Sequence, residues 1–356
     1  MTGETVVLLR GNPGTEDLIA EEALEELYAA SIIETRKGHG RVVAEVPEAF
    51  IERVYSMRSI HSATLLLLMR DGITPRRESL DIVRDAILDS PVSDMVPLGG
   101  TFAVRVVRTG EHEFTSLDLA RVAGDAVRAA VRSKRGFDPE VRLEAPSVVL
   151  ELDVIEDKLY FGVSLTGERS LHRRGIRVYD HPAALKPTLA YVMLRLASAR
   201  DGEAVADPMC GGGTVAIEAA YLYPTSRIVC MDKNPRHVRG AMMNAEAARV
   251  RKRIEFITGD AREMDRILGE DSIDVVVTNP PYGLRLGDPR SVRSLYRSFI
   301  GALYRVLRPG GRAAVITTEA EYTSRRAREV GFEVTHVRRV RHGDLWVSII
   351  ILEKGA

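Results

Sequence analysis

From about residue 186 to residue 352 the chain alternates regularly between segments with helical and segments with extended spacing of apolar residues. Such alternation predicts an α/β fold with a parallel, doubly wound sheet and helices on both faces. The last two extended segments have no helix between them, and we expect them to form an antiparallel edge. The predicted strands are Ala204–Ala206, Arg227–Met231, Ile254–Thr258, Ile273–Thr278, Ala313–Thr318, Glu333–Val340 and Leu345–Leu352, and the main predicted helices are Lys186–Arg200, Thr214–Tyr223, Pro235–Arg249, Ser291–Leu307 and Glu321–Val330.

The first 165 residues are organised differently, as short α/β segments that end in a predicted hairpin of Ser147–Ile155 and Leu159–Leu165. At about 150 residues per domain, a chain of 356 residues suggests two or three domains. A stretch with little apolar periodicity follows at 166–182, and its side chains include Arg169, His172, Arg173, Arg174 and Arg177. We interpret this stretch as a basic linker between the two parts of the chain.

A glycine-rich turn, Asp207-Pro208-Met209-Cys210-Gly211-Gly212-Gly213-Thr214, joins the first predicted strand of the sheet to the next helix. Its glycines let the backbone approach a ligand closely, and the following helix N-terminus offers free N–H donors. The spacing differs from the dinucleotide-binding pattern, and the absence of Gly-Lys-Ser/Thr excludes a nucleotide triphosphate P-loop. A merely structural tight turn is the alternative interpretation.

Two acidic residues stand near the ends of the next two predicted strands. Asp232 follows Arg227–Met231 and can accept hydrogen bonds from the hydroxyls of a ribose. Asp260 lies just beyond Ile254–Thr258 and can accept from an adenine amino group. Either carboxylate could instead cap a helix. Ligands of open α/β sheets bind at the carboxyl ends of the strands, so we expect both near the glycine-rich turn.

The most specific motif is Asn279-Pro280-Pro281-Tyr282-Gly283, which directly follows the predicted strand Ile273–Thr278. The two prolines stiffen the backbone and cannot donate hydrogen bonds. The carbonyl oxygens of Asn279 and Pro280 are therefore acceptors, and Tyr282 offers a flat face. Acceptors beside an aromatic ring suit a planar base with an exocyclic amine. A proline-rich loop without a ligand is the alternative.

Together these motifs resemble those of class I S-adenosylmethionine-dependent methyltransferases, in particular those that methylate exocyclic amines of nucleic-acid bases. Upstream, Leu171–Gly175 and Ala184–Ala190 are similar to the joint that precedes the catalytic domain in THUMP-containing RNA methyltransferases. Gly11–Glu16 resembles the ferredoxin-like opening of the same group. The resemblance covers the whole chain and is most specific in the catalytic half.

The resemblance implies a function for each matching residue. Catalysis is assigned to Asn279, Pro280 and Tyr282. The S-adenosyl-L-methionine site is assigned to Asp207, Pro208, Met209, Cys210, Gly211, Gly213, Thr214, Asp232, Lys233, Asp260, Ala261 and Asn279. RNA contacts are assigned to Arg169, His172, Arg173, Arg174 and Arg285. No metal is implied.

The resemblance also implies a domain plan: a ferredoxin-like domain at 1–70, a THUMP RNA-binding domain at 71–165, a linker at 166–182 and a Rossmann-like, seven-stranded methyltransferase domain at 183–356. The implied partner is tRNA, held at its acceptor stem and 3′ CCA end. We expect the protein to act as a monomer.

Within this group, Asn279–Arg285 looks most like the enzymes that make N2-methylguanosine at position 6 of tRNA. The position 10 enzymes more often have Asp-Pro-Pro-Tyr at this place. Guanine-N2 methylation at tRNA position 10 or in rRNA, and an RNA-binding protein with an inactive methyltransferase fold, remain alternatives. Small-molecule or protein-glutamine methyltransferases can also use Asn-Pro-Pro-Tyr, but they need no THUMP-like front end.

Composition limits the remaining possibilities. The two cysteines, Cys210 and Cys230, are too few for a disulfide framework or a cysteine-built zinc site. We interpret Cys210 as a small packing residue and expect Trp346, in an alternating strand, to lie in the core. The apolar stretch Leu65–Met69 is far shorter than the roughly 20 residues of a membrane-spanning helix. Nothing near Met1 suggests export, so the expected compartment is the cytoplasm.

Overall fold

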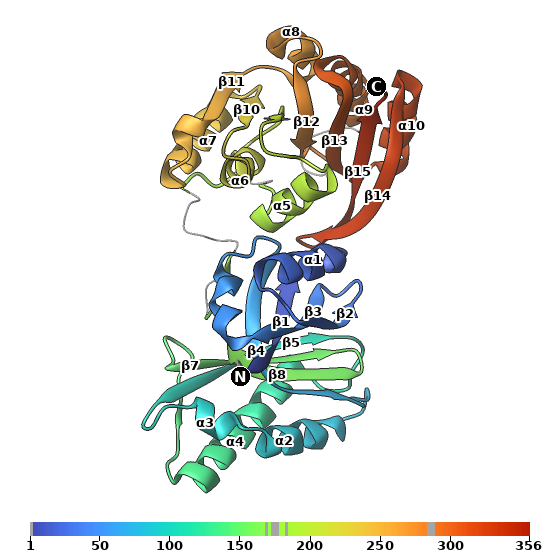
Figure 1. Cartoon of the computed structure of the whole chain (residues 1–356). Coiled ribbons are helices and arrows are strands. Elements are labelled where there is room, and N and C mark those ends of the chain that lie inside the picture. The colour runs from blue at the N-terminus through green and yellow to red at the C-terminus, as the bar shows by residue number, and fades with distance from the viewer. Residues whose placement is uncertain (1–2, 168–169, 172–177, 182–183, 283–288) are drawn as a thin grey trace. The chain divides into compact units, whose positions relative to one another are not determined.

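The computed structural model of the chain describes residues 3–167, 170–171, 178–181, 184–282 and 289–356 (Figure 1). The chain forms two compact units. One comprises Met1–Gly11 and Glu16–Leu171, and the other comprises Asn12–Thr15 and His172–Ala356. We call them the N-terminal unit and the C-terminal unit.

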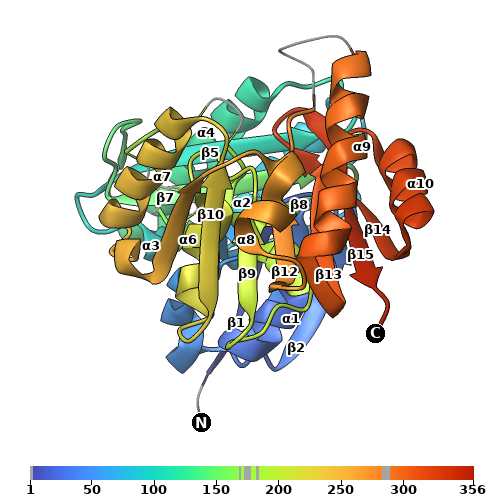
Figure 2. The same ribbon diagram turned by 90° about the horizontal axis from the view of Figure 1, so that it is seen from above.

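The C-terminal unit contains a seven-stranded sheet with the order β11-β10-β9-β12-β13-β15-β14. The first five strands in this order are parallel, and β15 pairs antiparallel with both β13 and β14. Figure 2 shows β10, β9, β12 and β13 side by side. The sheet confirms the predicted parallel fold and its antiparallel edge. Its strands are β9 (Ala204–Asp207), β10 (Arg227–Asp232), β11 (Ile254–Thr258), β12 (Ile273–Thr278), β13 (Leu307–Thr317), β14 (Phe332–His342) and β15 (Leu345–Lys354).

The helices of this unit agree with the predicted ones to within a few residues, except that α5 ends four residues before the predicted end. Ser198, just beyond it, has a positive φ of 49°, which a continuing helix does not allow. The helices are α5 (Pro187–Leu196), α6 (Thr214–Leu222), α7 (Pro235–Ala247), α8 (Met264–Leu268), α9 (Pro289–Val306) and α10 (Ala320–Val330), with short 3-10 turns η3 (Arg251–Arg253) and η4 (Ala261–Glu263).

The N-terminal unit is built on an eight-stranded sheet with the order β2-β3-β1-β4-β8-β7-β5-β6. Strands from both sides of residue 70 belong to this one sheet, and the division of 1–165 into two domains stays a prediction. The strands are β1 (Glu4–Gly11), β2 (Ser31–Arg36), β3 (Arg41–Pro47), β4 (Ile60–Asp71), β5 (Thr101–Thr109), β6 (Glu140–Val141), β7 (Val148–Ile155) and β8 (Lys158–Ser164), and the helices are α1 (Glu16–Glu26), η1 (Glu48–Tyr55), α2 (Ser79–Asp89), α3 (Val92–Met95) and α4 (Ser116–Arg135).

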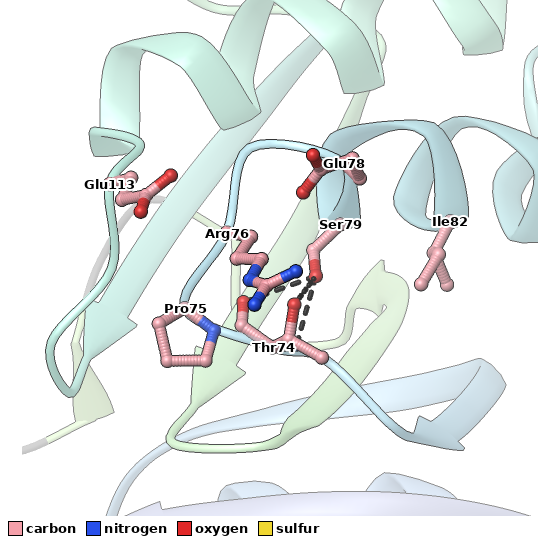
Figure 3. A pocket seen from close by; sticks show the side chains of 7 residues that line it. All are labelled: Thr74, Pro75, Arg76, Glu78, Ser79, Ile82 and Glu113. Atoms are coloured by element: carbon pink, nitrogen blue, oxygen red, sulfur yellow. Dashed lines mark hydrogen bonds between the residues drawn. The ribbon is translucent and has the colours of Figure 1, made fainter.

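A cavity of about 680 Å³ opens beside the start of α2 (Figure 3). Ser79 closes the loop before the helix, because its hydroxyl accepts a hydrogen bond from the backbone N–H of Thr74 at 2.8 Å. Five of the seven lining residues have polar or charged side chains, and the lining consists of Thr74, Pro75, Arg76, Glu78, Ser79, Ile82 and Glu113.

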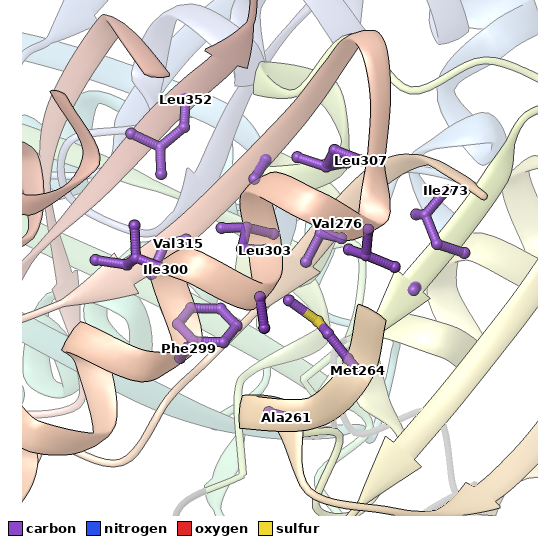
Figure 4. Packing of buried hydrophobic residues seen from close by; sticks show 14 of the residues in the cluster. Ala261, Met264, Ile273, Val276, Phe299, Ile300, Leu303, Leu307, Val315 and Leu352 are labelled. Carbon is purple, nitrogen blue, oxygen red and sulfur yellow. The ribbon is translucent and has the colours of Figure 1, made fainter. Parts of the chain in front are cut away.

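Each unit has hydrophobic cores of its own. In the N-terminal unit, α2 and α4 pack on β5, β7 and β8, while α1 packs on β1, β3 and β4. In the C-terminal unit, Phe299, Ile300 and Leu303 of α9 pack against strands β12, β13 and β15 (Figure 4). Burial of side chains this size is worth about 1.5–3 kcal/mol each, so this packing holds the strand ends in place.

Trp346 is not part of the core, and the prediction that placed it there is wrong. It is 41% exposed near the turn between β14 and β15. Pairing of β15 with β13 stops at Ser348, so Trp346 extends beyond the edge of its neighbouring strand.

Candidate active site

The glycine-rich turn lies between β9 and α6, as predicted. Gly211 and Gly213 have φ values of 50° and 80°, a conformation that side chains with a Cβ rarely adopt. A Cβ on Gly213 would come within 2.9 Å of the Ala241 Cβ on α7. The turn therefore depends on glycine both for its conformation and for its close packing.

Asp207 lies below this turn rather than at its surface. It is 4% exposed, and its Oδ1 accepts hydrogen bonds from the Thr278 hydroxyl at 2.8 Å and from the Met209 backbone N–H at 3.2 Å. Burial raises the pKa of Asp207 to about 7. Asp207 thus connects the end of β9 to Thr278 at the end of β12. Because Thr278 directly precedes Asn279, this hydrogen bond supports the site from below the glycine turn.

The raised pKa of Asp207 predicts a pH-dependent stability. A carboxyl group that binds its proton more tightly in the folded state stabilises the fold below pH 4 and loses that contribution as the pH rises through about 7. In urea unfolding, the stability of the wild type relative to Asp207→Asn should fall by a few kcal/mol between pH 4.5 and pH 7.5. An unchanged difference between the two proteins would contradict this assignment.

Asp232 closes β10 beside the turn. Its Oδ2 accepts from the Gly211 backbone N–H at 3.0 Å, and its Oδ1 accepts from the Asn234 backbone N–H at 2.9 Å. The His237 Nδ1 lies 3.2 Å from Oδ1. The carboxylate is thus fixed against the glycine turn at the carboxyl end of β10, where a ribose is bound in open α/β sheets.

Asp232→Ala should weaken the binding of S-adenosylmethionine by about 1.5–3 kcal/mol, because a charged hydrogen-bond acceptor is lost. Titration calorimetry measures this change directly. Thermal unfolding of the variant without cofactor controls for the loss of its contact with Gly211. Unchanged affinity would remove Asp232 from the binding site.

The segment 178–181 lies over the same turn, an arrangement that the sequence did not reveal. Asn244 of α7 holds it: Oδ1 accepts from the backbone N–H groups of Val178 and Tyr179 at 2.8 Å, while Nδ2 donates to the Gly212 carbonyl at 2.9 Å. The His181 ring lies about 3.4 Å from where a Gly211 Cβ would be. Asn244 thus joins this segment both to α7 and to the glycine turn.

The third strand end contributes less. Asp260 caps η4, and Arg262 binds its carboxylate with contacts of 2.6–3.1 Å. These hydrogen bonds from Arg262 lower the pKa of Asp260. Ala261 is buried in the core beside it, and Lys233 is exposed. A ligand that uses Asp260 would therefore share its carboxylate with Arg262.

The Asn-Pro-Pro-Tyr motif directly follows β12, next to the Thr278 that binds Asp207. Asn279 and Tyr282 are half-buried, and Pro280 is buried. The Tyr282 hydroxyl lies 3.5 Å from Nδ1 of His342 at the end of β14. Burial raises the pKa of the Tyr282 phenol above its ordinary value, and burial lowers the pKa of His342. Both rings are therefore neutral at physiological pH.

The five predicted RNA-binding residues lie outside the described residues: Arg169, His172, Arg173, Arg174 and Arg285. Their assignment stays a prediction. Among the residues that the structure describes, no group of three His, Cys, Asp or Glu side chains could hold a metal ion. No helix in the described part is long and apolar enough to cross a membrane.

Cys210 is not simply a packing residue. It forms a disulfide with Cys230, which corrects the interpretation drawn from the sequence. The pairing arises because Cys230 lies opposite Asp207 in the β9–β10 register, and the Cys210 backbone N–H donates to the Met231 carbonyl at 2.9 Å. The two Cα atoms are 5.6 Å apart, within the range for disulfides.

Reduction of this disulfide should destabilise the C-terminal unit. The bond closes a loop with a sequence separation of 20, for which the chain-entropy model gives about 3 kcal/mol. Dithiothreitol should therefore lower the midpoint of thermal unfolding by roughly 6–12 °C. A Cys210→Ala/Cys230→Ala variant is the control, and its midpoint should not respond to the reductant. An equal response in both proteins would argue against the bond.

Comparison with known proteins places the chain in a family. Residues 174–348 match the family described as RMKL-like, methyltransferase domain, and residues 77–164 match the THUMP domain. The protein named tRNA (guanine(6)-N2)-methyltransferase from Archaeoglobus fulgidus is 35% identical, with 95% of this chain and 90% of the relative covered. The protein of the same name from Thermus thermophilus is also 35% identical, with 96% and 98% covered.

Solved structures agree with these relatives. The crystal structure of TrmN from Thermus thermophilus superposes with a TM-score of 0.81 at 32% identity and covers 99% of this chain and all of that one. A putative methyltransferase solved in complex with S-adenosylhomocysteine shares the fold, with a TM-score of 0.80 at 18% identity and 100% and 99% coverage. The chain is therefore a methyltransferase of the THUMP-containing, RMKL-like family, to which the tRNA (guanine(6)-N2)-methyltransferases belong.

Proposed function

We propose that the protein is an S-adenosylmethionine-dependent tRNA guanine-N2 methyltransferase that forms N2-methylguanosine at position 6 of the acceptor stem. One observation carries this proposal: relatives with that printed name match the chain over nearly its whole length. It acts on tRNA as a monomer, in the cytoplasm where tRNA is processed.

The residues around the glycine turn fit the proposed cofactor. Gly211 and Gly213 bring the backbone close to the ligand, Asp232 accepts hydrogen bonds from the ribose, and the start of α6 provides N–H donors. When bound, S-adenosylmethionine supplies an activated methyl group on a sulfonium centre. The proposed cofactor-binding residues also include Pro208, Met209, Cys210, Thr214, Lys233, Asp260 and Ala261.

The proposed catalytic residues act on the guanine amine. The lone pair of this amine is delocalised into the ring, which makes the nitrogen a poor nucleophile. Asn279 and Pro280 accept its two protons in hydrogen bonds, so the nitrogen becomes pyramidal and its lone pair is aimed at the methyl group. The neutral Tyr282 ring supports the base. Positioning and electrostatic complementarity then provide most of the acceleration.

The acceptor stem is a paired region, so a guanine at position 6 must flip out of the helix to reach Asn279. We assign recognition of the 3′ CCA end to the N-terminal unit, which holds the THUMP match.

Methylation of rRNA is the second candidate. Proteins named Ribosomal RNA large subunit methyltransferase K/L, from Syntrophotalea carbinolica and Pseudomonas putida, are 28% and 26% identical. This chain spans only about half the length of those proteins, with 51% and 48% covered. Higher identity and full coverage favour the tRNA enzymes. Position 10 of tRNA is a further alternative, against which Asn279 counts because Asp is more common there.

One experiment tests the proposal. The protein is incubated with S-adenosylmethionine labelled in its methyl group and with total unmodified tRNA or rRNA, and the modified nucleoside is mapped. We expect N2-methylguanosine at tRNA position 6. Label in rRNA, or at position 10 of tRNA, would move the corresponding alternative to first place.

A further inference from the structure

The hairpin of β14 and β15 extends past the rest of the sheet at the edge where the candidate active site lies. Thr317, the last residue of β13, pairs with Ser348. Pairing between β14 and β15 continues further, to His342 opposite Leu345. The end of this hairpin thus lies beyond the carboxyl end of β13, and His342 on it contacts Tyr282 of the Asn-Pro-Pro-Tyr motif.

One face of this hairpin end is basic and aromatic. Arg341 lies opposite Trp346 in the register, and the Arg339 guanidinium lies over the Trp346 ring at 4.9 Å from its centroid. All three side chains belong to exposed residues. We call Arg339, Arg341 and Trp346 the hairpin face.

The charges on the hairpin face are largely unneutralised. Among the described residues, Arg339 forms no ion pair, and the nearest carboxylate of Arg341 is that of Asp344, 4.0 Å away and fully exposed. Burial lowers the pKa of the Lys186 ammonium group, and the nearby positive charge of Arg341 lowers it further. An accumulation of positive charge around an exposed indole is suited to a polyanion that also offers flat rings.

The backbone edge of β14 is already occupied here. The Arg341 backbone N–H donates to the Pro13 carbonyl at 3.0 Å, and the Asn12 side-chain amide donates to the Arg341 carbonyl at 2.8 Å. A Cβ on Gly14 would lie 2.2 Å from the Arg339 carbonyl oxygen, so this segment packs tightly on the strand. A partner strand therefore cannot extend the sheet at this point, and binding must use the side chains of the hairpin face.

We propose that the hairpin face binds the RNA strand next to the methylated guanine, with Arg339 and Arg341 on its phosphates and Trp346 stacked on a neighbouring base. This inference rests on the proposed function. Flipping the target guanine leaves its neighbours partly unstacked, and the exposed indole, on the same hairpin end as the His342 that contacts Tyr282, offers a replacement surface. RNA, rather than a protein, is favoured because phosphates match both arginines while bases match the indole.

Trp346 is the only tryptophan of the chain, so its fluorescence reports on this face alone. Addition of tRNA to the wild-type protein should quench the emission in a saturable manner, with a midpoint close to the KM for tRNA in the methylation assay. Trp346→Ala and Arg339→Ala/Arg341→Ala should raise this KM between about fivefold and a hundredfold. The affinity for S-adenosylmethionine should stay unchanged in both variants.

Arg251→Ala is the matched control. Its guanidinium also stacks on an aromatic ring, that of Phe256 at 4.6 Å, but η3 and the start of β11 lie at the opposite edge and opposite end of the sheet. Its KM should remain that of the wild type. For the double arginine variant, the slope of the logarithm of the tRNA binding constant against the logarithm of the salt concentration should be shallower by about one to two. The control should keep the slope of the wild type.

The readouts separate the inference from the proposed function. The inference would be overturned if tRNA were methylated without quenching of Trp346 emission and if the hairpin variants behaved like Arg251→Ala. The proposed function would then stay intact. Saturable quenching by tRNA without methylation of any tRNA would support the surface and refute the proposed reaction. Absence of both quenching and methylation would refute both.

Discussion

Asn279→Ala should lower the turnover number for tRNA methylation about 100-fold or more, while the affinity for S-adenosylmethionine changes far less. The side-chain carbonyl is proposed to act on the guanine amine as positive charge develops on its nitrogen. Removal of one group of this kind costs about 10²–10³ in rate in enzymes that stabilise developing charge by hydrogen bonds. Single-turnover kinetics and calorimetry measure the two quantities separately.

Asn279→Asp is the matched control for this substitution. It keeps a carbonyl oxygen at the same place and differs in charge, so it should retain much more activity than Asn279→Ala. The backbone carbonyl of Pro280 is unaffected in both variants. If Asn279→Ala lost cofactor binding but kept its maximal rate, Asn279 would contact the cofactor rather than the substrate.

The architecture of the C-terminal unit could be predicted because its signals are local. Strands β9, β10, β11 and β12 are short segments rich in apolar residues, and their alternation with helices leaves a parallel sheet as the main solution. The same logic placed the glycine turn and Asp232 at neighbouring strand ends, because carboxyl ends of parallel strands lie at one edge. In this part of the chain, position along a strand determines position in space.

Contacts between distant segments could not be predicted in the same way. Asn244 lies in the middle of α7, and nothing in its neighbourhood indicates that it holds residues 178–181 over the glycine turn. The number of cysteines does not indicate the Cys210–Cys230 disulfide, because the bond depends on the turn after β9 lying beside β10. Trp346 follows an alternating pattern, but the pattern does not show that the neighbouring strand ends at Thr317.

Replacing guanine 6 of a tRNA substrate by adenine should reduce methyl incorporation to background. Adenine carries hydrogen at C2, so the amine that Asn279 and Pro280 are proposed to hold does not exist in this base. The position 6 pair is restored by a compensating change on the opposite strand, which keeps the acceptor stem intact. Quantification of N2-methylguanosine by mass spectrometry separates this site from other guanines in the same molecule.

Removal of the 3′ CCA end, with guanine 6 left in place, tests the proposed recognition of the acceptor end by the N-terminal unit. If the N-terminal unit holds the terminus at a fixed distance from the catalytic residues, trimming should lower kcat/KM by about tenfold or more, since correct placement contributes several kcal/mol to such reactions. Cofactor affinity should not change, because the glycine turn and Asp232 lie in the C-terminal unit. Full activity on trimmed tRNA, or on the adenine 6 variant, would refute the position assignment and favour position 10 or rRNA. Loss of activity both on trimmed tRNA and on the adenine 6 variant would instead show that the enzyme needs the acceptor end and a guanine at position 6 together.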